Sequence, residues 1–321
     1  TVDRMYYYNA GIDNDVTKAQ ADVASGTSPY TAGFRKSFKL TNGNQSSGAG
    51  ATDEIIIRQN IEAQDIAKSG WNYTSSSSYI TLSYWVKSSV AQNFYVNLQT
   101  VDGTAQNYVT ETGTLTADTW TKVTKTIPGN SNLQFDNNNA KGMHIQWNVF
   151  RGTSVTGTRP LNAWAAYSSS TRVPDMTSTW YTTNNATFEI TGVQLEVGSV
   201  ATDFEHRSFA QELTLCQRYF QKVRGGIGCS AGNTTQVNGV LRYKPMRANP
   251  SVSKGTGNTY NYGNMINTGF NSTNTPSFFK NDGTLGNSSY ALAGFSGLVA
   301  GDAMRDEGEG SSATFDLSAE L

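Results

Sequence analysis

Residues 79–86 of the chain read Tyr-Ile-Thr-Leu-Ser-Tyr-Trp-Val, and this stretch decides the fold class. Its even-numbered positions are apolar or aromatic, whereas most of its odd-numbered positions carry a hydroxyl group. Successive side chains of a β-strand point to opposite faces, so a period of two predicts a strand with one buried face. A helix would instead need apolar residues three and four positions apart.

The same alternation recurs up to residue 197, with polar loops between the runs. The other runs are residues 34–40, 94–99, 121–127, 144–150 and 187–197. No helical segment of crossover length lies between them, so we predict an all-β fold, a jelly-roll β-sandwich of antiparallel strands. The last run changes phase at Thr191-Gly192, which predicts a glycine bulge. This bulge would turn Val193, Leu195 and Val197 toward the core.

Composition and charge narrow the possible partners. Only 37% of residues are hydrophobic and 15% are charged, and 24 basic against 25 acidic residues give a net charge of −1. We therefore expect no nucleic acid partner, which would need a broad basic surface. The chain shows neither an apolar run of membrane-spanning length nor a signal peptide, which predicts a soluble protein without membrane insertion. It opens at Thr1 inside a strand-like motif, so we expect further sequence before it.

A helix follows the last of these strands. Ser208 and Gln211 have the spacing of a capping box, and apolar residues recur at helical spacing as far as Phe220. We predict a helix over 208–223. Cys216 would then lie on its buried side as a structural thiol rather than as a nucleophile.

These features divide the chain into three parts. Residues 1–204 form the predicted jelly roll, and residues 205–224 contain the linking helix. Residues 225–321 are rich in Gly, Asn, Ser and Thr, with short apolar islands. The islands predict a small C-terminal β-domain, which neighbouring subunits complete at an oligomer interface or the fibre tip; the alternative is a largely flexible segment.

Residues for catalysis or metal binding are sparse. The two histidines and two cysteines are scattered and support neither a zinc site nor a Ser-His-Asp arrangement, so we predict no catalytic residue and no cofactor. The segment around Asp13 and Asp15 is rich in oxygen ligands, which suits either a structural calcium ion or a solvated loop. Paired carboxylates need only spatial proximity. The sequence therefore leaves open Glu54, Glu62, Glu111, Glu189 and Glu196.

If the strands share one sheet, their non-core sides form an aromatic and amide-rich face with almost no charge. Aromatic rings stack on the C–H faces of sugars, and amides both donate and accept hydrogen bonds with hydroxyls. We therefore predict glycan binding on this face, the alternatives being an ordinary polar sheet face or a contact between subunits. The predicted members are Trp85, Tyr95, Asn97, Gln99, His144, Gln146 and Asn148.

The segment from residue 190 to 222 resembles a signature of tail fibre and other appendage proteins of tailed bacteriophages. It reads ITGVQLEVGSVATDFEHR over 190–207 and ELTLCQRYFQK over 212–222. Weaker likenesses lie at residues 3–8 and 80–88. In that family the segment closes a carbohydrate-binding-module-like jelly roll and leads into the distal fibre. The resemblance thus implies a fold and a setting for residues 1–222, and it implies no catalytic residue.

The same resemblance implies a virion subunit that is assembled in the host cytoplasm and contacts other virion proteins. Its jelly roll would attach to host cell-surface polysaccharide without catalysis, and a homotrimer would multiply individually weak contacts. A neutral, polar surface favours a glycan over a polyanion. One alternative is a capsid-decorating or tail-scaffolding protein. Another is a polysaccharide depolymerase, against which the lack of a solenoid repeat counts.

Overall fold

A computed structural model describes residues 5–224, 227–254, 260–264, 269–272, 276–281, 287–293, 298, 300, 303–306 and 314–320. The contacts between Cα atoms divide the chain into two units, Thr1–His206 and Arg207–Glu320. Each unit has its own hydrophobic core, so the two are described separately.

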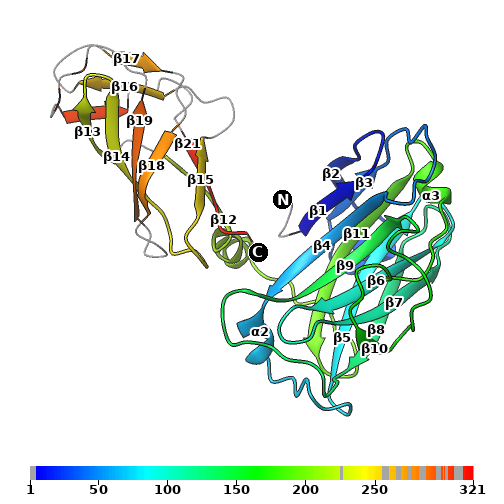
Figure 1. Cartoon of the computed structure of the whole chain (residues 1–321). Coiled ribbons are helices and arrows are strands. Elements are labelled where there is room, and N and C mark those ends of the chain that lie inside the picture. The colour runs from blue at the N-terminus through cyan, green and yellow to red at the C-terminus, as the bar shows by residue number, and fades with distance from the viewer. Residues whose placement is uncertain are drawn as a thin grey trace. The chain divides into compact units, whose positions relative to one another are not determined.

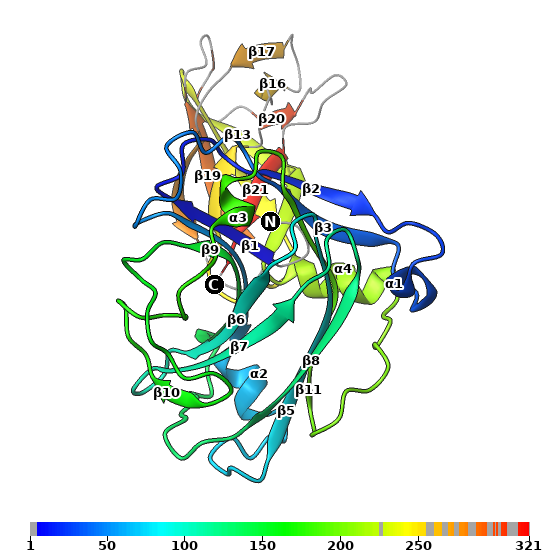
Figure 2. The same cartoon turned by 90° about the vertical axis from the view of Figure 1, so that its right-hand side faces the viewer.

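The first unit consists of two antiparallel sheets packed face to face (Figure 1, Figure 2). The six-stranded sheet runs in the order β1 (Met5–Ala10), β4 (Glu54–Glu62), β9 (Lys141–Arg151), β6 (Asn93–Thr100), β7 (Gln106–Thr114) and β10 (Trp164–Ala166). The five-stranded sheet runs in the order β2 (Thr17–Asp22), β3 (Lys36–Thr41), β11 (Thr187–Val197), β5 (Tyr79–Ser88) and β8 (Thr121–Pro128). The chain passes repeatedly from one sheet to the other, which confirms the predicted all-β sandwich of the jelly-roll type.

Short helices lie in the connections of this unit. They are α1 (Ser28–Thr31), α2 (Ala63–Ala67) and α3 (Thr179–Thr182). Within the described ranges, no helix has both the length and the apolar character that a membrane crossing requires.

The core of the first unit lies between the sheets and follows from the alternation in β5. All four even-numbered residues of the run 80–86 are buried, as predicted. Tyr84 meets Trp147 of β9 edge to face, with the ring centroids 5.7 Å apart. Full burial of a large apolar side chain stabilises the fold by about 1.5–3 kcal/mol, so each buried residue of this run contributes to the stability of the sandwich.

The predicted glycine bulge is present in β11. The register shifts between Thr191 and Gln194, and Gly192 has a φ of +60°. Val193 and Leu195 pack against the core as expected. The predicted burial of Val197 is wrong, because this last residue of the strand is 46% exposed.

Gly192→Ala is expected to lower the free energy of unfolding by about 2 kcal/mol. A Cβ atom there would lie 2.5 Å from the ring of Phe34, in addition to the left-handed backbone strain. Urea denaturation measures the loss. Gly48→Ala is the matched control, because Gly48 has a φ of +78° with no atom within 4 Å of an added Cβ. A loss no greater than that of the control would show that Phe34 does not require the glycine.

The second unit begins with α4 (Phe209–Gln217) and contains two further sheets. One has the order β12 (Phe220–Arg224), β21 (Thr314–Ser318) and β15 (Ser251–Lys254). The other has the order β17 (Gly269–Ser272), β16 (Tyr260–Asn264), β20 (Ala303–Asp306), β13 (Ile227–Asn233), β14 (Gln236–Arg242), β19 (Asn287–Ala293) and β18 (Pro276–Asn281). A small core that includes Val237, Leu241, Phe315 and Leu317 supports this β-domain.

The helix α4 differs from its prediction in length and in burial. Its capping box is confirmed, since the Ser208 backbone N–H donates to Gln211 Oε1 at 3.0 Å. The helix stops at Gln217 instead of residue 223, because Phe220–Arg224 pairs with β21 near the end of the chain. Such a distant pairing leaves no local trace in the sequence. The predicted buried side is also wrong, because Phe209 is 81% exposed and Cys216 is only half-buried.

Candidate functional site

Six of the seven predicted glycan-binding residues lie together on the outer face of the six-stranded sheet. Cross-strand register sets Asn97 opposite Gln146. It likewise sets Tyr95 opposite Asn148 and Gln99 opposite His144. The placement follows from strand geometry, because alternate residues of β6 and β9 point away from the core. We call this surface the outer face.

The seventh residue, Trp85, lies in the other sheet, so the prediction that all seven share one sheet is wrong. The strand β5 pairs with β8 and β11, although β6 is its neighbour in the sequence. Consecutive strands of a jelly roll often belong to opposite sheets. Alternation shows which residues share a side of one strand, but it does not show which strands share a sheet.

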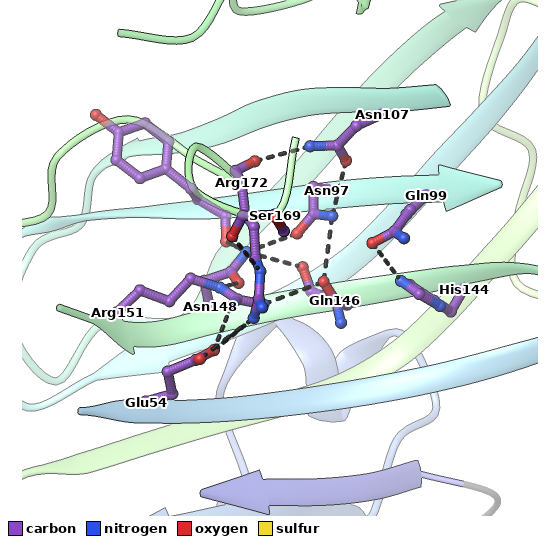
Figure 3. Close-up of polar contacts among 11 residues, drawn as sticks. Glu54, Asn97, Gln99, Asn107, His144, Gln146, Asn148, Arg151, Ser169 and Arg172 are labelled. Carbon is purple, nitrogen blue, oxygen red and sulfur yellow. Dashed lines mark hydrogen bonds and ion pairs between the residues drawn. The ribbon is translucent and has the colours of Figure 1, made fainter. Parts of the chain in front are cut away.

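The amides of the outer face form a buried row of hydrogen bonds (Figure 3). Asn97 Nδ2 donates to Asn107 Oδ1 at 2.9 Å and to Gln146 Oε1 at 3.2 Å. Asn148 Nδ2 donates to Asn97 Oδ1 at 2.9 Å. These side chains satisfy one another, which is what burial of an amide requires. The row therefore stiffens the sheet beneath the outer face. The burial of these amides does not support the prediction that they contact a sugar directly.

The connection formed by residues 152–178 covers this row. Asn107 Nδ2 donates to the backbone oxygen of Arg172 at 2.7 Å (Figure 3). The same connection contains β10, and the Asn162 and Tyr167 backbone N–H groups extend its pairing with β7 by donating to the backbone oxygens of Val109 and Ala105, both at 2.8 Å. The cover buries side chains that a bare sheet would expose.

Charged side chains join the row at one end. Arg151, with no exposed side-chain surface, forms an ion pair with Glu54 and donates through Nε to Asn148 Oδ1. Arg172 Nη1 reaches the same carboxylate at 3.2 Å. Burial lowers the pKa of Arg151 to about 10, with Glu54 opposing the shift, so the guanidinium remains charged at neutral pH. Glu54 thus lies between two cations.

His144 is buried and neutral on this face. Its Nε2 atom lies 3.1 Å from Gln99 Oε1, an acceptor, which makes Nε2 the protonated nitrogen. Its Nδ1 atom is buried, with no hydrogen-bond partner among the described residues. Burial lowers the pKa of His144 to about 2, and the positive charges of Arg58, Lys141 and Arg151 lower it further in the same direction. The expectation of a face with almost no charge is therefore wrong, because the fold gathers cations on it.

The strand β1 contributes an open part of the outer face that the residue pattern did not single out. Tyr6 is 45% exposed and Tyr8 is 37% exposed. Between them Tyr7 points the other way and packs against the core. Tyr6 lies opposite Arg58 of β4, whose guanidinium carbon is 6.0 Å from the centre of its ring. The sequence contains the run Tyr6-Tyr7-Tyr8, in which the outer two rings share one side of a strand. It does not show that this strand pairs with β4.

A separate cavity of about 480 Å³ adjoins Trp85 on the five-stranded sheet. Its aromatic lining includes Trp85, Phe34, Phe204 and His206. The rings of Phe34 and Phe204 lie 4.8 Å apart, and those of Phe204 and His206 lie 5.0 Å apart. Phe204 and His206 belong to the signature segment 190–207, so this segment folds back onto the sheet.

Hydrogen bonds hold that segment in its turn. Glu196 accepts from the Thr202 backbone N–H at 2.9 Å and from its hydroxyl at 2.6 Å. The backbone N–H of Glu205 donates to Gln194 Oε1 at 2.9 Å. The polar residues of the signature therefore have a structural role in closing the sandwich.

The calcium candidates already have protein partners. Asp13 accepts from the Ser47 backbone N–H at 2.7 Å, and the hydrogen bonds from Ser47 lower the pKa of Asp13. Asp15 accepts from Asn9 Nδ2 at 2.6 Å and from Lys18 Nζ at 2.9 Å. Among the residues for which the structure gives positions, no group of three or more His, Cys, Asp or Glu could hold a metal ion.

The candidate carboxylates are also engaged by neighbouring side chains. Besides Glu54 and Glu196, Glu189 pairs with Lys87 at 3.0 Å. Glu62 accepts from Gln64 Nε2 at 2.6 Å, and Glu111 accepts from Asn93 Nδ2 at 2.9 Å.

No protein-family model matches the chain, and no curated protein matches it. Among solved structures, the enzymatically active domain of tailspike protein 4 of bacteriophage CBA120 aligns with 62% of this chain, at 10% identity and a TM-score of 0.33. The alignment spans only 20% of that tailspike chain. A carbohydrate-binding module of the CBM4 type aligns with 61% of this chain and 88% of its own, at 13% identity and a TM-score of 0.32.

A third similar structure is the family 11 carbohydrate-binding module of the cellulosomal cellulase Lic26A-Cel5E of Clostridium thermocellum. It aligns with 64% of this chain and 91% of its own, at 12% identity and a TM-score of 0.29. These likenesses assign no residue role and no activity to this chain.

Proposed function

We propose that this chain is a subunit of a tail fibre or another appendage of a tailed bacteriophage, and that its sandwich binds host cell-surface polysaccharide without catalysis. The observation that carries the binding role is the exposed pair Tyr6 and Tyr8 beside Arg58 on the outer face. Exposed rings next to hydrogen-bonding groups suit a sugar, because the rings cover its C–H faces while the polar groups meet its hydroxyls. The resemblance of residues 190–222 supports the virion setting.

The contacts of the face support binding without reaction. The buried amide row and the Glu54–Arg151 pair hold the strands in a fixed register, so the exposed part is preorganised. His144 stays neutral through the physiological range and has no role as a proton donor there. The carboxylates considered for hydrolysis are held by partners, which supports a non-catalytic role.

A binding measurement tests the site. Tyr6→Ala combined with Tyr8→Ala is expected to weaken binding to a host polysaccharide by about tenfold or more, because each stacking contact contributes about 0.5–1.5 kcal/mol. Affinity electrophoresis of the full chain in gels that contain extracted host polysaccharide gives the change. Tyr79→Ala, on the far side of the five-stranded sheet, is the matched control. Equal affinities of the double variant and the control would remove the outer face as the site.

Trp85 and Tyr95, which the sequence placed on one face, need separate substitutions. Trp85 and Tyr95 lie on opposite sheets, so a double variant cannot test one face. Tyr95→Ala addresses the outer face, whereas Trp85→Ala addresses the aromatic cavity. Loss of binding with Trp85→Ala alone would move the proposed site to that cavity.

Exposed apolar residues on α4 support the proposal that copies of the chain assemble, as a homotrimer that also contacts other virion proteins. Phe209 is 81% exposed and Leu213 is 42% exposed. Apolar side chains grouped in this way mark association surfaces. Light scattering of the purified chain measures its mass, and Phe209→Ser with Leu213→Ser is expected to shift that mass toward the 34.7 kDa of one chain. An unchanged mass would exclude α4 from the interface.

A further inference from the structure

The outer face carries both cations and carboxylates, among them Glu111 opposite Tyr95, which accepts from Asn93 Nδ2. Its cations are Arg58, Lys141, Arg151 and Arg172. Glu54 is held by the ion pairs with Arg151 and Arg172, and so offsets only part of that charge. Glu62, the register partner of Lys141, is fully buried and accepts from Gln64.

Two of these cations form no ion pair with a described residue. Among the residues that the structure describes, neither the Arg58 nor the Lys141 side chain has a hydrogen bond or an ion pair. Arg58 Nε is buried without an acceptor, and the guanidinium carbon lies 6.0 Å from the ring centre of Tyr6. Arg58 as a whole is only half-buried, and a guanidinium without an ion pair beside an exposed ring is available to an acceptor from outside the chain.

We propose that the polysaccharide bound on the outer face carries carboxylate groups, and that Arg58 and Lys141 bind them beside the Tyr6 ring. This inference rests on the proposed function and names its ligand class. A carboxylate suits Arg58, because the planar guanidinium donates two parallel hydrogen bonds to it. The Tyr6 ring would cover the apolar side of the same sugar unit.

A nucleic acid is the other polyanion to consider, and the observations favour a polysaccharide. Nucleic-acid-binding surfaces place many cations along a long path, whereas on the described part of the outer face the two cations without an ion pair, Arg58 and Lys141, lie close to each other. The cluster is small enough to bind one or two acidic sugar units. Local charge of this kind also steers an acidic polymer toward the face at low salt.

The test uses the full chain and a panel of acidic polysaccharides. The panel contains polygalacturonate, alginate, hyaluronate and polysialate, each paired with its carboxyl-reduced form, together with single-stranded DNA. We expect at least one acidic polymer to bind about tenfold or more tightly than its reduced form, with an affinity that falls as salt rises. Arg58→Gln is expected to weaken that binding about tenfold to a hundredfold, and Arg58→Lys to weaken it less.

Lys125→Gln on β8 is the matched control and should leave the affinity unchanged, because Lys125 lies in the five-stranded sheet. Thermal unfolding curves confirm that each variant is folded. Equal binding of an acidic polymer and its reduced form, or loss with Tyr6→Ala but not with Arg58→Gln, would overturn the carboxylate proposal and leave polysaccharide binding in place. DNA binding as tight as that of the acidic polymers would also overturn it. Binding to no polysaccharide of the panel or of the host would overturn both proposals.

Discussion

Glu54→Gln is expected to lower the free energy of unfolding by about 3–5 kcal/mol, because it leaves the buried Arg151 charge without its counter-ion. Arg151 has no exposed side-chain surface, and among the described residues the Glu54 carboxylate forms its other ion pair with Arg172, which is also a cation. All six tryptophans lie between residues 71 and 180, in the first unit. Their fluorescence during urea denaturation therefore follows the sandwich alone.

The ion pair between Asp22 and Lys36 supplies the control for this substitution. Both side chains are more than half exposed, so Asp22→Asn should change the stability by less than about 1 kcal/mol. Glu54→Leu combined with Arg151→Met should recover part of the loss, since an apolar pair removes both buried charges. A Glu54→Gln loss no larger than that of Asp22→Asn would show that water reaches Arg151.

His144 is expected to make the sandwich less stable in mild acid, by about 2–3 kcal/mol between about pH 7 and about pH 4.5. Its pKa is about 2 in the folded chain against 6.5 for an ordinary histidine. As the pH falls below 6.5, the unfolded chain takes up a proton that the folded chain does not, so the free energy of unfolding decreases. The structural cause is the buried Nδ1 atom, which would become an N–H without an acceptor.

His144→Gln is expected to remove most of this decline, because the amide still donates to Gln99 and does not titrate. Tryptophan fluorescence at a series of pH values measures the slope. His206→Gln is the control and should leave the decline in place. Carboxylates with a lowered pKa, such as Asp13 and Glu196, do not cause this decline. Their contribution to the free energy of unfolding is lost only below their ordinary pKa values of 3.8 and 4.5. A decline that His144→Gln does not change would contradict the buried, neutral histidine.

The strands that the sequence revealed are those with one apolar and one polar face. The run at 80–86 showed the alternation clearly and its apolar residues are all buried. The strands β2, β4, β7 and β10 were missed, and the reasons are clear for β4 and β7. β7 is mostly polar, since its outward residues join the amide row, and Asn107 is its clearest example. In β4, three consecutive isoleucines follow Glu54, and the middle one, Ile56, is covered on the outer face instead of facing the core.

The candidate site also contains residues that the sequence placed correctly and contacts that it could not show. The phase of β6 and β9 placed Asn97 and His144 on the side away from the core, as the structure has them. The sequence could not show that residues 152–178 would cover them, because a long connection has no periodic pattern. It also could not show that Arg58 would lie beside Tyr6, which depends on the pairing of two strands about fifty residues apart.

The sequence by itself determined the fold class, the bulge at Gly192 and the capping box at Ser208, because each arises from neighbours along the chain. Tertiary structure alone decided that Trp85 and Tyr95 lie on opposite sheets, that the amide row is buried, and that a chain of net charge −1 gathers cations on one face. The physical reason is that burial and electrostatics act through space, between residues that only the pairing of distant strands brings together.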